Sequence, residues 1–350
     1  MNRLSRVLIG TTVVAVLAAV EFPWLGWFAG FDPATALAAS TTPAPTVEEL
    51  TLEETIPLGD VKGRIDHMAI DAPRGRLFVA ELGNDSVAVV DLRAHKLMQR
   101  LAGFKEPQGV AYAADTDRLF IASGGSGKVD IRKGDDLTLI SQISLGADPD
   151  NIRLDGPDRI IVGYGGGALA VLDAATGGKI ADIALAAHPE AFLPEPGGDR
   201  IFVNEPQARK IAVIDKRSGA EAASWGVPGA SSNFPMALNT VGRLLYAVYR
   251  TPALISAFDT ESGDIKAQLP TCSDADDVFH DADRKRVYVV CGDGTIAVLS
   301  ADDGGLRELS RLQTRSGART GLFVPELDRL FVAVPARSGG QAELRVYRPR

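Results

Sequence analysis

An arginine followed by three strand-forming residues recurs along the chain at nearly constant spacing. Its seven copies are Arg76-Leu77-Phe78-Val79, Arg118-Leu119-Phe120-Ile121, Arg159-Ile160-Ile161-Val162, Arg200-Ile201-Phe202-Val203, Arg243-Leu244-Leu245-Tyr246, Arg286-Val287-Tyr288-Val289 and Arg329-Leu330-Phe331-Val332. Successive arginines are 42, 41, 41, 43, 43 and 43 residues apart. Because six consecutive intervals agree so closely, one supersecondary unit must be repeated along the chain.

Each unit contains further strand patterns at fixed places. About 10 residues after the arginine comes a second apolar strand that commonly ends in Asp, as in Val87–Asp91 and Ile211–Asp215. A turn rich in Gly and Ser follows, such as Thr176–Gly178, and then a third strand such as Ile180–Leu185. A short segment before each arginine completes four strands. Units of this size and composition, repeated radially, are typical of β-propeller blades.

The two ends of the chain complement each other. The seventh unit supplies Gly321–Val324, the strand at Arg329 and Leu344–Tyr347, so it lacks its outermost strand. The segment Glu54–Gly59 resembles Ile143–Gly146, which ends another unit. Pairing it with the last unit would remove an open sheet edge. We therefore predict an all-β, seven-bladed β-propeller over residues 53–350, with the ring closed by an N-terminal strand that completes blade seven.

The units resemble those of the YVTN-repeat β-propeller family, whose members are often called YncE-like. The likeness is carried by units such as Ile201-Phe202-Val203-Asn204 followed by Ile211-Ala212-Val213-Ile214-Asp215, and it covers about residues 53–348. It implies the propeller fold. Members of that family are described variously as surface-layer, DNA-binding and quinoprotein-like proteins, so the resemblance implies no single function.

The first 38 residues are predicted to be a signal peptide. Arg3 and Arg6 precede an apolar run from Val7 to Val20, and Ala36-Leu37-Ala38 resembles a cleavage site. Cleavage there would leave residues 39–52 as a linker before the propeller. The predicted location is therefore periplasmic or secreted.

An uncleaved membrane anchor is the alternative reading of this leader. Glu21 interrupts the apolar region, and a second apolar patch from Phe22 to Phe31 makes the leader long. The domain lies outside the cytoplasm in either case, and it contacts the membrane only if the leader is uncleaved.

Charge and motif content exclude several classes of function. The chain has 45 acidic and 37 basic residues, and removing two of each with the leader leaves a net charge of -8. This charge disfavours nucleic acid as a partner, since binding phosphates requires a basic face. The sequence contains no G-x-S-x-G, H-E-x-x-H or C-x-x-C motif. No set of nucleophile, base and orienting residue can be assembled, so no catalytic residue is assigned.

Candidate site residues emerge when the units are aligned on their repeat arginines. The positions just before each innermost strand are Asp66 and His67, Gln108 and Gly109, Asp150 and Asn151, Glu190 and Ala191, Phe234 and Pro235, Asp276 and Asp277, and Arg319 and Thr320. In a propeller these positions ring one mouth of the central channel, and loop residues there commonly bind ligands. Arg64 and His188 are neighbours in sequence. The predicted ring has five carboxylates against one or two arginines and two histidines, although such residues can also serve only to cap strand ends.

The predicted function is an exported binding or scaffold protein, whose acidic channel mouth receives a cation, a peptide, a small ligand or a partner protein. No cofactor is required, although carboxylates in one funnel could hold a divalent cation such as Ca²⁺. The alternative is an enzyme, either a metal-dependent, lactonase-like hydrolase or a quinoprotein-like oxidoreductase. The sequence favours binding over catalysis, and we expect a monomer.

The two cysteines, Cys272 and Cys291, are predicted to form a disulfide. An exported protein meets an oxidising compartment, and the hairpin entering blade six would bring both residues to one face. Two separate thiols are the alternative, if the Cα atoms lie more than about 7 Å apart.

Overall fold

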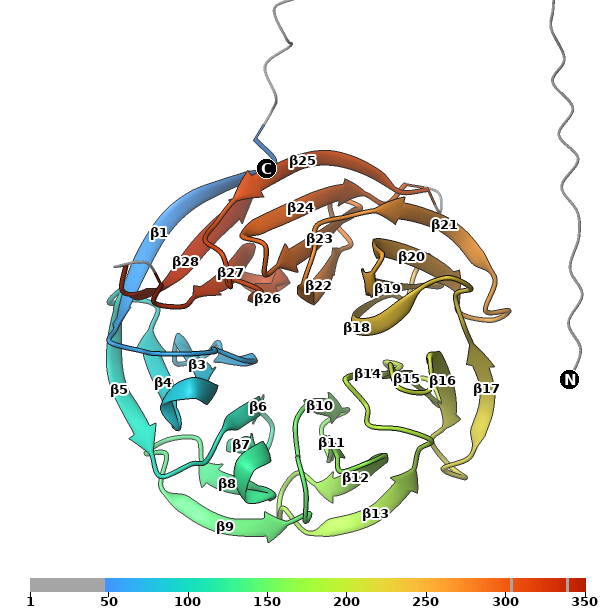
Figure 1. The fold of residues 1–350 in the computed structure, drawn as a ribbon. Coiled ribbons are helices and arrows are strands. Elements are labelled where there is room, and N and C mark those ends of the chain that lie inside the picture. The colour runs from blue at the N-terminus through green and yellow to red at the C-terminus, as the bar shows by residue number, and fades with distance from the viewer. Residues whose placement is uncertain (1–47, 303–304, 338–339) are drawn as a thin grey trace, which may run out of the picture. The chain divides into compact units, whose positions relative to one another are not determined.

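The computed structural model describes residues 48–302, 305–337 and 340–350, and the predicted signal peptide lies outside them. In this part of the chain, 28 strands form seven four-stranded antiparallel sheets. Figure 1 shows the sheets arranged in a ring, which confirms the predicted seven-bladed β-propeller. No helix among these residues is long and apolar enough to cross a membrane.

Each blade is named by its place in the chain, from blade one (β2 to β5) to blade seven (β26 to β28 with β1). The innermost strands are β2 (Met68–Asp71), β6 (Pro107–Ala113), β10 (Ile152–Asp155), β14 (Ala191–Pro194), β18 (Ser231–Asn239), β22 (Ala275–Asp281) and β26 (Thr320–Val324). The second strands are β3 (Arg76–Glu81), β7 (Arg118–Ser123), β11 (Arg159–Tyr164), β15 (Arg200–Glu205), β19 (Leu244–Thr251), β23 (Arg286–Cys291) and β27 (Arg329–Val334). The repeat arginine is therefore the first residue of the second strand in every blade except blade five. There, Arg243 lies one residue before the strand begins.

The outer half of each blade follows the same pattern. The third strands are β4 (Ser86–Asp91), β8 (Lys128–Lys133), β12 (Ala168–Asp173), β16 (Lys210–Asp215), β20 (Ala253–Asp259), β24 (Thr295–Ser300) and β28 (Ala342–Pro349). The outermost strands are β5 (Lys96–Ala102), β9 (Leu139–Ser144), β13 (Lys179–Ala184), β17 (Glu221–Trp225), β21 (Ile265–Pro270), β25 (Arg307–Gln313) and β1 (Leu50–Gly59). Three short 3-10 helices each lie between two strands of the same blade. They are η1 (Leu82–Asn84) between β3 and β4, η2 (Gly124–Ser126) between β7 and β8, and η3 (Pro325–Leu327) between β26 and β27.

The Asp that ends several third strands fixes the following turn. The Asp173 carboxylate accepts hydrogen bonds from the backbone N–H groups of Ala175 and Thr176, and Asp215 does the same for Arg217 and Ser218. These are Asx-type turns, in which a short carboxylate replaces a backbone acceptor. The hydrogen bonds lower the pKa of both carboxyl groups, because they stabilise the charged form.

The hydrophobic core lies between blades rather than within one layer. The described residues form seven apolar clusters, and each joins two neighbouring sheets. Second strands are buried on both faces, as in β3, so they read in the sequence as continuous apolar runs. Outermost strands such as β5 expose most of their residues. The repeat thus supplies each blade with two apolar faces, which are buried only when neighbours pack on both sides.

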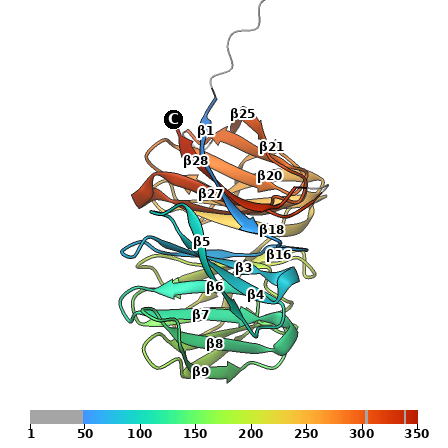
Figure 2. The ribbon, with the colours of Figure 1, turned by 90° about the vertical axis from the view of Figure 1, so that its left-hand side faces the viewer.

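The ring closes as predicted. β1 pairs antiparallel with β28 from Leu50 opposite Pro349 to Gly59 opposite Ala342, and Figure 2 shows the two strands side by side. β1 begins at Leu50, three residues before the predicted limit of the propeller. The side chain of Leu50 is buried against blades six and seven, which explains the longer strand. Glu53 of β1 also pairs with the repeat arginine Arg329, whose Nε lies 2.6 Å from Oε2.

Candidate ligand-binding site at the channel mouth

A cavity of about 500 Å³ lies in the central channel, and its lining follows the innermost strands along their length, as from Asp66 to Ile70 and from Asp276 to His280. Among the predicted positions, it is lined by Asp66, His67, Asp150, Asn151, Glu190, Ala191, Phe234, Pro235, Asp276 and Asp277. The lining also includes apolar side chains, such as Met68 and Leu193, and the polar side chains of Arg153 and His280. A volume of this size is typical of small-molecule sites in proteins.

Backbone pairing brings the predicted residues to the mouth. Asp150 donates its N–H to Gly163 O at 2.9 Å, and Asn151 O accepts from Gly163 at 3.0 Å. The segment before β10 therefore continues the antiparallel ladder with β11 beyond the innermost strand. In blade six the register shifts between Ala275 and Asp277, so Asp276 occupies a β-bulge. A bulge redirects a side chain, and here it projects the Asp276 carboxylate into the mouth.

Five of the predicted positions are not among the residues that line the cavity: Gln108, Gly109, His188, Arg319 and Thr320. The side-chain amide of Gln108 donates to Asp148 Oδ1 at 3.0 Å. Arg319 and His188 each contact a carboxylate that does line the cavity. The aligned positions of the seven units therefore do not all present a side chain to the channel.

One side of the mouth, which we call the arginine cluster, comprises Arg250, Asp274, Asp276 and Arg319. Asp276 Oδ1 lies 2.5 Å from Arg250 Nη2, and its Oδ2 lies 3.1 Å from Arg319 Nε. Arg319 also donates to both oxygens of Asp274, at 2.9 and 3.0 Å. The Arg250 guanidinium stacks over the Phe234 ring at 3.7 Å from its centroid. The carboxylates of this cluster are therefore already neutralised by guanidinium groups.

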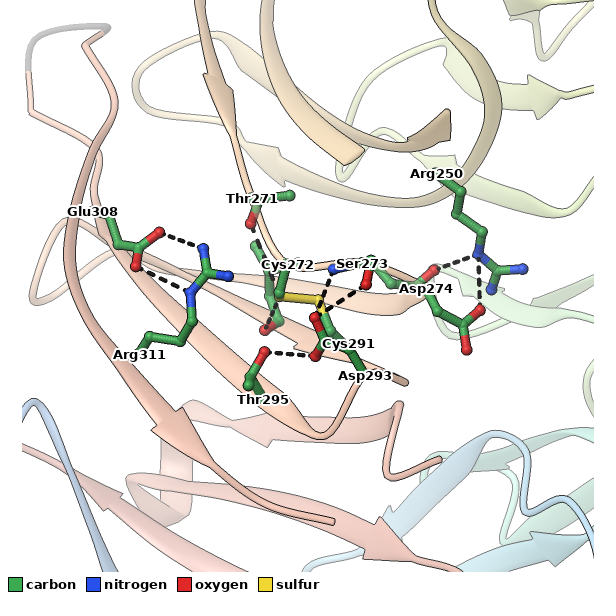
Figure 3. The surroundings of a disulfide bond; sticks show 12 residues. Arg250, Thr271, Cys272, Ser273, Asp274, Cys291, Asp293, Thr295, Glu308 and Arg311 are labelled. Carbon is green, nitrogen blue, oxygen red and sulfur yellow. Dashed lines mark hydrogen bonds and ion pairs between the residues drawn. A yellow bond between two sulfur atoms is a disulfide. The ribbon is translucent and has the colours of Figure 1, made fainter. Parts of the chain in front are cut away.

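A disulfide holds the loop that carries this cluster. Cys272 and Cys291 are bonded, with Cα atoms 5.9 Å apart, which confirms the predicted pairing. Figure 3 shows the bond beside Ser273 and Asp274. Asp293 Oδ2 accepts hydrogen bonds from the backbone and the hydroxyl of Ser273 at 2.9 and 3.1 Å. The loop before β22 is thus fixed to the end of β23.

The opposite side, which we call the histidine side, comprises Asp66, His67, Asp150, Asn151, His188 and Glu190. Asp150 contacts imidazoles and no arginine among the described residues: it lies 4.0 Å from His67 Nε2 and 3.9 Å from His188 Nε2. Asp150 Oδ1 and Asn151 Oδ1 are buried, and neither has a hydrogen-bond partner among the described residues. Such unpaired buried acceptors are uncommon in proteins and need an explanation.

The two histidines differ in protonation. Burial and the nearby Arg153 guanidinium lower the pKa of His67 to about 4, so this imidazole is neutral at pH 7. The Asp150 carboxylate and a 2.6 Å contact between Nδ1 and Gly165 O raise the pKa of His188 to about 9, so this imidazole is a cation. Two histidines that contact the same aspartate therefore carry different charges.

Burial also changes the carboxylates. It raises the pKa of Glu190, with the Asp150 charge adding to the effect, and it raises that of Asp66 against the opposing attraction of Arg64. Burial likewise raises the pKa of Asp277 to about 8, although its carboxyl accepts the Gly321 N–H at 2.8 Å. A carboxyl with this pKa is mostly protonated at pH 7.

Arg64 joins the two sides. Its Nη2 lies 3.0 Å from Asp66 Oδ2 and 3.6 Å from Asp276 Oδ2. A further arginine, Arg153, lies on β10 and lines the cavity. With Asp274 of the arginine cluster, the mouth holds six carboxylates, four arginines and two histidines. Arg64 and Arg319 are the two arginines that the aligned positions and their neighbours predicted. Arg153 and Arg250 belong to strands rather than to the aligned loop positions, which is why the alignment missed them.

The carboxylates do not form a metal centre by themselves. No group of three or more His, Cys, Asp or Glu side chains within residues 48–302, 305–337 and 340–350 is arranged to hold a metal ion. Arg250 and Arg319 occupy the positions around Asp276 where further oxygen ligands would be needed.

Comparison with known proteins gives the fold but no family. No protein-family model matches the chain, and no curated protein matches its sequence. A solved structure titled hydrazine synthase, from Kuenenia stuttgartiensis, is 18% identical with a TM-score of 0.69, covering 81% of this chain and 94% of the other. A chain of a mitotic checkpoint complex is 15% identical with a TM-score of 0.73, covering 93% and 99%. At these identities the likeness shows the propeller fold alone.

Proposed function

We propose that this protein is a binding protein that captures a small organic cation at the channel mouth. A propeller in general suits a binding or scaffold role, because its rigid ring presents loops from several blades to one ligand. The observation that carries the proposal is the histidine side. There, Asp150 lines the cavity with an unpartnered Oδ1 and without an arginine partner among the described residues.

The contrast with Asp276 supports a ligand role for Asp150. Asp276 is held by two guanidinium groups, so it contributes to the architecture of the mouth. Asp150 has only imidazoles, at 3.9 and 4.0 Å. A cationic group entering the cavity could donate to its free oxygen, and Glu190 lies on the same wall. Apolar residues of the lining, such as Met68 and Leu193, favour an organic cation over a bare metal ion.

Calorimetric titration with n-butylammonium chloride tests the proposal, with the same titration repeated for Asp150→Asn. We expect weak, salt-sensitive binding to the native protein, weakened about tenfold or more in the variant, since hydrogen bonds to charged groups contribute about 1.5 to 3 kcal/mol. The matched control is Asp199→Asn, whose carboxylate pairs with Arg217 at the surface. Equal binding by the native protein and Asp150→Asn would refute this function.

Calcium chloride titrated in the same way addresses the second cation that the sequence suggested. Calcium prefers six to eight oxygen ligands, and competition with butylammonium at Asp150 would identify the same site. Calcium that binds equally to Asp150→Asn would have to bind elsewhere on the surface.

We also infer that the protein acts outside the cytoplasm. The charged, apolar and small-residue order of residues 1–38 supports export, and the disulfide is consistent with an oxidising compartment. Intact mass of protein from an exporting host tests this inference. A mature chain that begins near Ala39 or Ser40 is expected, and retention of Trp24 and Trp27 in membrane-associated material would support the anchor instead.

A further inference from the structure

Arg153 carries a charge that no described residue balances by direct contact. It is the second residue of β10 and lines the cavity. Its Nη1 donates to the Ile152 carbonyl at 2.8 Å, and no carboxylate of the described residues lies within 4.0 Å of it. A guanidinium has five N–H donors, so most of its hydrogen-bonding capacity has no protein partner here.

The surroundings of Arg153 make this unusual. Burial lowers its pKa, with Asp277 and Asp150 opposing the effect from a distance. Arg153 is partly buried and shares the cavity with apolar residues such as Met68 and Leu193, so water can screen the charge only partly. Arginine is the residue that binds carboxylate and phosphate groups with two parallel hydrogen bonds.

The groups around Arg153 leave its charge available. His67 is neutral at pH 7, because its pKa is about 4. Asp277, the carboxylate with the largest opposing effect, has a pKa of about 8 and is mostly protonated at pH 7. It can then donate a hydrogen bond instead of competing with an anion.

The cationic and anionic subsites lie on one segment of chain. Asp150 and Arg153 are three residues apart, and the segment is extended, since Asp150 and Asn151 continue the ladder with Gly163. Both side chains line the same cavity, and the Asp150 charge opposes the lowering of the Arg153 pKa by burial without a direct contact between them. One small molecule that carries an ammonium group and a carboxylate could therefore bind to both side chains.

We propose that the ligand of the channel mouth is a small zwitterion, such as a short unblocked peptide, with its ammonium group at Asp150 and its carboxylate at Arg153. This inference rests on the proposed function, because it assumes that Asp150 receives a cationic group. It adds the second charge of the ligand.

Three peptides that differ only at their ends test the proposal. Triglycine, triglycine amide and N-acetyltriglycine are titrated calorimetrically at low ionic strength into the native protein. We expect triglycine to bind about tenfold or more tightly than either blocked form, since each block removes one charge-assisted interaction. Equal affinities for triglycine and its amide would overturn the proposal.

Variants then assign each end of the peptide. Arg153→Gln should bind triglycine and triglycine amide equally well, but should still prefer triglycine over N-acetyltriglycine. Asp150→Asn should bind triglycine and N-acetyltriglycine equally well, but should still prefer triglycine over its amide. Arg153→Lys, which keeps a positive charge, should retain part of the preference. Arg217→Gln is the matched control, because this exposed arginine pairs with Asp199 outside the cavity. Melting curves of each variant check that the fold is intact.

Failure of this proposal can be told apart from failure of the proposed function. If butylammonium binds through Asp150 but all three peptides bind equally or none binds, the zwitterion is wrong and the cation site stands. If neither butylammonium nor any peptide binds, both are wrong. A preference for the free carboxylate that persists in Arg153→Gln also contradicts the role of Arg153.

Discussion

The two sides of the channel mouth use the same acidic residue type in opposite ways. In the arginine cluster, Asp276 is held by Arg250 and Arg319, on a loop that a disulfide fixes. On the histidine side, Asp150 has two imidazoles at 3.9 and 4.0 Å and an oxygen without a partner. The difference shows that carboxylates around one ring can have different ion-pair partners and therefore different roles. One half is structural, and the other half keeps free hydrogen-bonding capacity for a ligand.

Neutralising one carboxylate on each side should distinguish the structural role of Asp276 from the ligand-binding role of Asp150. Asp276→Asn should lower the free energy of unfolding by about 1.5 to 3 kcal/mol, because Arg250 and Arg319 lose one of the two carboxylates that they share and keep only Asp274. Asp150→Asn should lower it by less, because no arginine pairs directly with Asp150 and only the His188 imidazolium loses a carboxylate neighbour. Denaturant unfolding of the two variants measures both values. Equal losses would mean that the two sides do not differ.

Removing the disulfide should destabilise the arginine cluster without affecting the histidine side. Replacing Cys272 and Cys291 by Ser opens a loop with a sequence separation of 19 residues, which should cost about 3 kcal/mol in the chain-entropy model. We expect a lower melting temperature and unchanged binding of butylammonium. A variant that melts like the native protein would show that the loop before β22 is held by its hydrogen bonds alone.

Ionisation of Asp277 should make the free energy of unfolding depend on pH at values higher than those at which an aspartate usually ionises. Its pKa is about 8 in the folded protein and about 3.9 in an unfolded chain, so its contribution is fully present below about pH 4 and is lost as the pH rises through 8. Asp277→Asn cannot ionise, so it should become increasingly more stable than the native protein as the pH rises from 4 to 8. Melting temperatures from pH 4 to 9 measure this. Parallel curves for the two proteins would contradict the raised pKa.

The two histidines should give smaller and opposite pH dependences. The lowered pKa of His67 means that its contribution is present above pH 6.5 and is lost as the pH falls through about 4. The raised pKa of His188 means that its contribution is present below pH 6.5 and is lost as the pH rises through about 9. Replacing either histidine by Gln should reduce the change in the free energy of unfolding across that histidine's pH interval by about 1 to 2 kcal/mol. NMR titration of both imidazoles gives the pKa values directly, and similar values for the two would remove the distinction.

The sequence by itself determined the fold, because the information is local and repeated. Every blade carries the same order of repeat arginine, apolar strand and turn, so the positions of the second strands could be read to within one residue, as in blade five at Arg243. The missing strand of the seventh unit predicted the pairing of β1 with β28. The end of the channel that collects polar residues followed from the same alignment.

The tertiary structure alone decided which charges meet at the mouth. Arg250 lies on β19 and Arg153 on β10, so neither belongs to the aligned loop positions, and Asp276 reaches its partners only because a β-bulge redirects it. Gln108 occupies an equivalent position but bonds to Asp148 instead. A repeat fixes backbone positions at a constant period, whereas ion pairing depends on side-chain reach between blades. Protonation depends in addition on burial, which is why His67 and His188 differ although both contact Asp150.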